Sequence, residues 1–179
     1  MMRNFCSNPA ATTGTCLPML LSAFSHMGIM HLGFNMMALN SFGPKLVEML
    51  GTEHFLATYL TAAVFSSWTS YVYKVATSRT GLSLGASGAL FALIGIYGTL
   101  FPENELAIIF LPMFPFSADT GIKGLACLDV VGLILKWRVL DHAAHLGGLL
   151  FGIIWIKYGI HYVDPLLKWW HEQRRTWIK

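Results

Sequence analysis

The chain has 179 residues, of which 55% are hydrophobic and 12% are charged, with a formal net charge of +3. Soluble domains carry charge on about 25% of their residues, so this composition disfavours a soluble globular domain and indicates a single membrane domain. The small, dispersed charge gives no sign of nucleic-acid binding, and the three irregularly spaced cysteines predict neither a disulfide framework nor a metal motif.

Five apolar segments predict an all-α membrane protein with five transmembrane helices. In chain order, the predicted helices cover residues 28–48, 53–74, 87–101, 119–137 and 141–161. The first of them contains Gly43 and Pro44, where we expect a kink, because proline lacks the N–H that the helix needs. The distribution of lysine and arginine between the connecting segments gives no clear membrane orientation.

Two further segments lie outside these helices. Between the third and fourth helices, ELAIIFLPMFPFS contains two prolines and predicts an apolar loop resting on or in the membrane. After the fifth helix, Asp164 and Pro165 are expected to open a short tail helix within an interfacial or soluble tail, residues 164–179. Its basic residues and Trp169, Trp170 and Trp177 suit a membrane interface, although a solvated helical end fits them equally well.

The third predicted helix is too short for a complete membrane span. A bilayer core about 30 Å thick needs roughly 20 helical residues, whereas Ser87 to Phe101 is about 15 residues, or about 22 Å. Pro102 and the acidic residues after it place the far end at water, so the Ser87 end should stop inside the membrane. Unpaired N–H groups there are tolerated only inside protein or beside water, so we expect water to reach Ser87.

Ser87 needs a base to become a useful nucleophile, and histidine suits that role because its pKa is about 6.5. On the fifth predicted helix, His145 shares a face with Gly148 and Gly152, whose GxxxG spacing lets another helix approach closely. The third helix offers a matching face, formed by Ser87, Phe91, Gly95 and Gly98. Either face alone is explained by close packing of two helices with no catalytic role. Together, with a broken helix that begins at a serine, they favour a Ser87–His145 dyad.

The first predicted helix brings further polar side chains to the same depth. His31 and Asn35 lie one turn apart on one face, and the first, third and fifth helices enter from the same side. Polar groups within a membrane span are costly and point to function. Serine attack on an amide creates an oxyanion, which His31, Asn35 and the Ser87 N–H can stabilise. An interhelical hydrogen bond is the alternative task for Asn35, and His26 either joins this group or braces its loop.

The acidic residues nearby are expected to have structural tasks. Asp141 should cap the N-terminus of the fifth helix. Asp129 should form a hydrogen bond to a neighbouring helix, with His142 as a candidate partner, so we expect a dyad and not a triad.

A haem or metal ion between helices is a further alternative use of the histidines. It would be held by His26, His31, His142 and His145, and Ser87 and Asn35 would then have no task.

Three motifs resemble the rhomboid intramembrane serine proteases and occur in that family's order. They are HxxxN at His31 to Asn35, GASGA around Ser87, and AHLGGLLFG from Ala144. The stretches SNPA, CLPMLLSAFSH, SLGASGALFALIG, ELAIIFLPMF and DHAAHLGG are similar to the mitochondrial branch of that family. The resemblance covers nearly the whole chain and implies that Ser87 is the nucleophile and His145 the general base. It further implies oxyanion or substrate binding by His31, Asn35, His26 and Gly85.

The resemblance also implies a fold, a setting and a substrate. It implies a rhomboid-like helical bundle, residues 1–179 as a single protease domain, and the mitochondrial inner membrane as its location. The substrates would be single-pass membrane helices, admitted by a lateral gate near the fourth helix and cut near small or helix-destabilising residues. No metal, organic cofactor or nucleic acid is implied, and the oligomeric state stays open.

One departure concerns the number of helices. The family core has six and the mitochondrial branch adds one, whereas five are predicted here, so the first core helix should be missing. A catalytically inactive rhomboid-like protein that binds membrane helices is therefore the alternative function.

Overall fold

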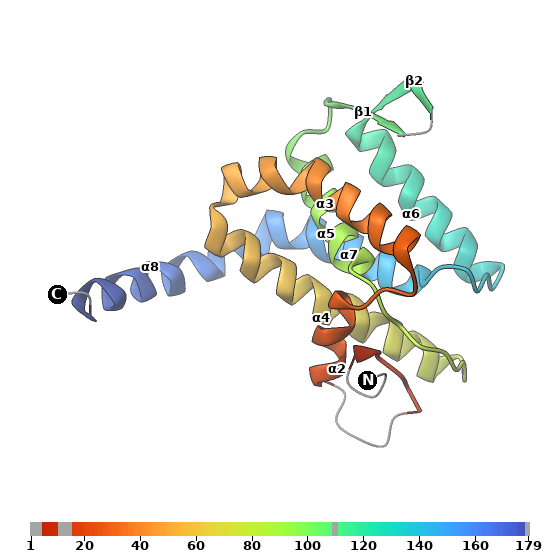
Figure 1. Ribbon diagram of the computed structural model, residues 1–179. Coiled ribbons are helices and arrows are strands. Elements are labelled where there is room, and N and C mark those ends of the chain that lie inside the picture. Colours follow the sequence, from red (N-terminus) through yellow and green to blue (C-terminus); the bar gives the residue numbers. More distant parts are fainter. Residues whose placement is uncertain (1–4, 11–15, 109–110, 178–179) are drawn as a thin grey trace.

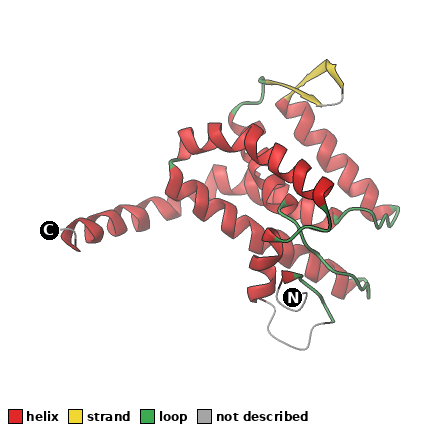
Figure 2. Cartoon of the chain, viewed as in Figure 1, coloured by secondary structure: helices red, strands yellow, loops and turns green. Residues whose placement is uncertain are grey.

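The computed structural model describes residues 5–10, 16–108 and 111–177 of the chain. Most of this part is helical, which confirms the expected all-α class (Figure 2). Along the chain the helices are α2 (Cys16–Leu21), a 3-10 helix (Ser22–Phe24), α3 (Ile29–Leu50), α4 (Thr52–Ala76), α5 (Ser87–Leu100), α6 (Ala118–Ile134), α7 (His142–Ile154) and α8 (Ile160–Trp177). Helix α5 lies in the middle and packs against α3, α4, α6 and α7 (Figure 1).

The predicted helices at 28–48, 53–74 and 87–101 correspond to α3, α4 and α5, with ends that differ by a few residues. Pro44 lies inside α3, where the chain gives up one helical hydrogen bond. The fourth predicted helix ends earlier than expected, at Ile134, because Lys136 adopts a left-handed backbone with φ 59°.

The prediction of an apolar loop between α5 and α6 is wrong, because this segment forms a β-hairpin. Strand β1 (Glu105–Ile108) pairs antiparallel with β2 (Leu111–Ser117), and residues 109–110 lie outside the described part of the chain. The two prolines are compatible with β2 because both strands of a two-stranded sheet are edge strands, which leave some N–H positions unpaired.

The prediction that a separate tail helix begins at Asp164 and Pro165 is also wrong. Helix α7 continues through a π-helical turn (Trp155–Gly159) into α8, which runs through Pro165 and extends away from the bundle (Figure 1). The Trp155 indole fixes this turn to α4 by donating a hydrogen bond to Thr58 Oγ1 at 2.8 Å.

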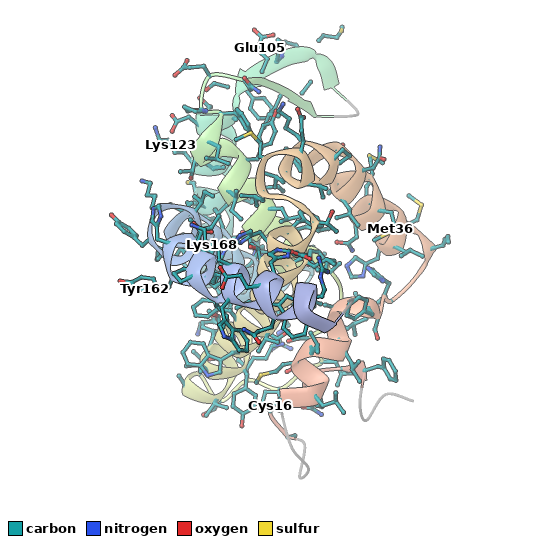
Figure 3. All side chains as sticks on the ribbon, turned by 90° about the vertical axis from the view of Figure 1, so that its left-hand side faces the viewer. Cys16, Met36, Glu105, Lys123, Tyr162 and Lys168 are labelled. Carbon is teal, nitrogen blue, oxygen red and sulfur yellow. The ribbon has the colours of Figure 1, made fainter. Side chains whose placement is uncertain are left out.

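Helix α8 carries the aromatic and basic residues of the predicted tail. It faces the viewer in Figure 3, where Tyr162 and Lys168 lie on it, and Tyr162 is 83% exposed. Trp169 and Trp170 are also exposed, whereas the side chain of Trp177 lies outside the described part of the chain.

Glycines allow α5 and α7 to approach until their backbones touch. A Cβ atom at Gly148 would overlap the carbonyl oxygen of Gly88, and one at Gly152 would overlap that of Ala92. Gly95 serves α5 in the same way, since its Cβ would lie 2.6 Å from the carbonyl oxygen of Leu149. Gly98, expected on this face, instead approaches α6. The close contact brings the first turns of α5 and α7 together.

The number of membrane crossings stays a prediction. Within the described residues, one helical stretch, His142–Arg174, is long and apolar enough to cross a membrane. A second qualifies if Cys16–Phe24 and Ile29–Leu50, which meet at 88°, count as one span. Helix α5 is apolar but has only 14 residues, or about 21 Å. The sequence predicted that this third helix would be too short for a complete span.

Candidate active site

Ser87 and His145 lie in direct contact where α5 and α7 begin. Ser87 is the first residue of α5 and His145 belongs to the first turns of α7, so the close packing of these helices sets their separation. Ser87 Oγ is 2.8 Å from His145 Nε2, within a hydrogen bond. When Nε2 accepts from the hydroxyl, the ring carries its proton on Nδ1, and the serine proton can pass to Nε2 during attack.

The His145 ring is held by packing as well as by this hydrogen bond. Its side chain is buried, and Phe91 stacks on it with ring centroids 4.2 Å apart and 13° between the planes. Phe91 lies one helical turn after Ser87, so α5 supplies both the hydroxyl and the aromatic surface against the ring. The sequence placed Phe91 on this face without assigning it a role.

Asp129 of α6 lies behind the pair. Its Oδ1 is 2.7 Å from His142 Nδ1, which confirms the expected hydrogen bond to a neighbouring helix. The same oxygen is 3.5 Å from His145 Nδ1, but the two atoms form no hydrogen bond. The geometry is therefore a hydrogen-bonded Ser–His pair with a buried carboxylate nearby.

His31 lies against the loop that precedes Ser87. A Cβ atom at Gly85 would come within 2.6 Å of His31 Cε1 and 2.9 Å of Nε2, so the ring uses the space that glycine leaves. Gly85 also has φ +120°, a backbone conformation that favours glycine, and its N–H donates to the Ser22 carbonyl at 2.8 Å. The His31 Nδ1 accepts from the Met27 N–H at 3.4 Å.

Asn35 and His26 complete this side of the site. Asn35 is 4% exposed, and its Nδ2 donates to the His31 carbonyl at 2.8 Å, a bond within α3 and not the interhelical bond considered from the sequence. The His26 ring meets His31 edge to face at 5.1 Å. His26 precedes α3 in a loop, where burial, and then the neighbouring His31, lower the pKa of His26 and favour its neutral form at pH 7.

The four histidines form two pairs. His142 and His145 have centroids 6.5 Å apart, and His142 is bound to Asp129. Within the described ranges, no group of three or more histidine, cysteine, aspartate or glutamate side chains is arranged to hold a metal ion.

Comparisons with known proteins identify the family of the chain. The family model described as "Rhomboid domain" matches residues 13–162. The chain is 51% identical over 178 residues to "Presenilin-associated rhomboid-like protein, mitochondrial" of Bos taurus, covering 97% of this chain and 47% of that protein. It is 39% identical over 138 residues to "Rhomboid protein 1, mitochondrial" of Saccharomyces cerevisiae, covering 75% of this chain and 39% of that protein.

A bacterial relative carries a protease name. The chain is 32% identical over 127 residues to "Rhomboid protease GluP" of Bacillus subtilis, covering 71% of this chain and 23% of that protein. The chain thus spans less than half the length of these relatives, whereas the family model covers most of the chain. By that match and by the identity to the mitochondrial relatives, the chain belongs to the rhomboid family.

Proposed function

We propose that this chain is an intramembrane serine endopeptidase in which Ser87 is the nucleophile and His145 the general base. The observation that carries the proposal is the 2.8 Å hydrogen bond between Ser87 Oγ and His145 Nε2. Membership of a family that includes a protein named as a protease supports it. Residues 1–179 then act as one protease domain, with 164–179 as its interfacial or soluble tail.

The reaction follows from the positions of these groups. Ser87 Oγ attacks the carbonyl carbon while its proton moves to His145 Nε2, which forms the tetrahedral intermediate. The C–N bond then breaks, His145 passes the proton to the leaving amine, and an ester to Ser87 remains. Water attacks this ester, gives a proton to His145 and releases the carboxylic product, and Ser87 recovers its proton.

The oxyanion of each intermediate needs hydrogen-bond donors, because negative charge develops on the former carbonyl oxygen. The Ser87 backbone N–H stands at the start of α5, where helical N–H groups have no partner in the helix. His31 and Asn35 are the side-chain donors we assign to the oxyanion, and His26 and Gly85 shape the adjoining surface. One such donor contributes about 2.7–4 kcal/mol in a soluble protease.

The substrates we propose are single-pass membrane proteins of the mitochondrial inner membrane. Two relatives are named as mitochondrial, which supports the mitochondrial part of this location. A transmembrane helix engages its carbonyl groups in hydrogen bonds, so attack is easiest near small or helix-destabilising residues, where the backbone unwinds. A lateral opening near α6 would admit such a segment from the lipid to Ser87.

Reconstitution in liposomes with a single-pass helical substrate tests this proposal. We expect two products whose new termini lie within or beside the membrane segment, with no product from Ser87→Ala. A stable complex of wild-type protein and substrate that yields no product would contradict the protease function. That result would support a rhomboid-like protein that only binds membrane helices.

A substitution at Gly85 tests the placement of His31. We expect Gly85→Ala to reduce cleavage by roughly tenfold or more, because the new methyl group displaces the His31 ring from the nucleophile loop. Gly81→Ala is the matched control, since Gly81 has φ +139° in the same loop but has no atom within 4 Å of its Cβ position. Equal cleavage rates for the two variants would show that His31 does not act from this position.

A further inference from the structure

We propose that Ser83 and Asp141 are positioning residues that hold the nucleophile loop against the helix that carries the general base. This inference rests on the proposed protease function, because it concerns how the Ser87–His145 pair is kept in register. Neither side chain forms a hydrogen bond with the side chain of Ser87 or His145, and both residues act through the segments they join.

The link is one short hydrogen bond between segments that are distant in the sequence. Ser83 Oγ donates to Asp141 Oδ2 at 2.6 Å across a separation of 58 residues. Ser83 precedes Ser87 by four residues, and Asp141 precedes His145 by four. The bond thus ties together the two chain segments immediately before the nucleophile and the base.

Asp141 is rigidly attached to the base helix. Its Oδ1 accepts from the Ala144 N–H at 3.2 Å, the helix cap expected from the sequence, and its carbonyl accepts from the His145 N–H at 3.0 Å. Any shift of this carboxylate therefore shifts the first turn of α7 and the His145 backbone with it.

Ser83 is equally well attached to its loop. It is 7% exposed, and its backbone exchanges two hydrogen bonds with Ser7, at 2.9 and 2.8 Å. The loop is therefore paired to the N-terminal segment through its backbone. The Ser83 hydroxyl reaches Asp141 and also contacts two groups of α4, Ser70 Oγ at 3.0 Å and Lys74 Nζ at 2.5 Å.

Helix α4 completes the surroundings of the carboxylate. Asp141 Oδ2 also lies 2.7 Å from Ser70 Oγ and 3.0 Å from Lys74 Nζ. Burial raises the pKa of Asp141, but the Lys74 charge and the bonds from Ser83, Ser70 and Lys74 outweigh it, so this pKa lies below its usual value. The carboxylate is therefore ionised at neutral pH, and both serine hydroxyls are kept as donors to it.

Ser70 provides the control, because Ser70 and Ser83 are both buried serines bonded to the same carboxylate oxygen. Ser70 Oγ also lies 3.0 Å from Ser83 Oγ, so Ser70→Ala removes a bond to Ser83 but leaves the bond from Ser83 to Asp141 in place. Helix α4 carries none of the residues assigned to the reaction, whereas the Ser83 loop leads directly into Ser87. A merely structural role predicts similar effects of Ser70→Ala and Ser83→Ala. A positioning role predicts a catalytic effect from Ser83→Ala alone.

The experiment measures the rate at which a fluorophosphonate probe labels Ser87 of the full chain in liposomes. We expect Ser83→Ala to slow labelling roughly tenfold or more. Ser70→Ala should label at a rate near that of wild-type protein. Ser83→Thr, which restores the hydroxyl, should recover the wild-type labelling rate. Hydrogen exchange followed by mass spectrometry should be faster over residues 81–87 in Ser83→Ala only. If Ser83→Ala does not fold, Ser83→Cys, which keeps the side-chain size and weakens the donor, replaces it.

The outcomes separate the two proposals. If the probe never labels Ser87 of the wild-type protein, the protease function is contradicted. Hydrogen exchange over residues 81–87 then tests only whether the Ser83–Asp141 hydrogen bond holds the loop in place. Labelling of wild-type protein, with equal rates in the two alanine variants, overturns the positioning role and leaves the protease function standing. Unchanged exchange over residues 81–87 in Ser83→Ala overturns it as well.

Discussion

Replacing His145 with alanine is expected to reduce cleavage in liposomes by about a thousandfold or more, because Ser87 loses the base that accepts its proton. Helix α7 should stay folded, since the ring is removed without inserting bulk between the helices. The assay is product formation from a single-pass substrate, with circular dichroism as the check on helix content. Cleavage near the wild-type rate would show that His145 is not the base.

Ser87→Ala and the double variant provide the control for this experiment. Residues that act as one catalytic unit lose nearly all of their effect when either is removed, so the double variant should cleave no more slowly than either single one. His142→Ala removes the Asp129 hydrogen bond but not the Ser87 contact, so it should reduce cleavage less than His145→Ala does. Losses that add in the double variant would mean that the two residues act separately.

Gly152→Ala is expected to destabilise the bundle and to impair catalysis with it. The new methyl group would overlap the Ala92 carbonyl oxygen, which belongs to the backbone and cannot move without separating α5 from α7. Overpacking of this kind costs about 1–3 kcal/mol. The measurement is thermal unfolding in detergent, followed by circular dichroism, together with the cleavage rate in liposomes.

Gly124→Ala is the matched control, since Gly124 lies within α6 and has no atom within 4 Å of its Cβ position. Alanine has the higher helix propensity, so this variant should gain up to about 1 kcal/mol. Equal melting temperatures for Gly152→Ala and wild-type protein would mean that α5 and α7 do not pack as closely as the structure has them.

Much of the fold could be predicted because it depends on patterns that lie close together in the sequence. Long apolar runs located α3, α4 and α5, and the spacing of Gly148 and Gly152 predicted that α7 packs closely against another helix. The contact of Ser87 with His145 followed from that packing, since both stand near the start of their helices.

Other features depend on contacts that no local pattern reveals. The proline-containing hairpin lacks the alternation of a usual strand, and the π-helical turn depends on Trp155 reaching Thr58 of another helix. The link from Ser83 to Asp141 depends on how α4, α5 and α7 pack, so the sequence showed Asp141 only as a helix cap.

The most direct test of the Ser87–His145 pair is covalent labelling of the wild-type chain in liposomes with a fluorophosphonate probe, with the modified residue identified by mass spectrometry. We expect the adduct on Ser87 alone, with none in His145→Ala, because only a serine activated by a base reacts with this reagent at a useful rate. An adduct on another residue, or equal labelling of Ser87 with and without His145, would contradict a serine protease built on this hydrogen bond.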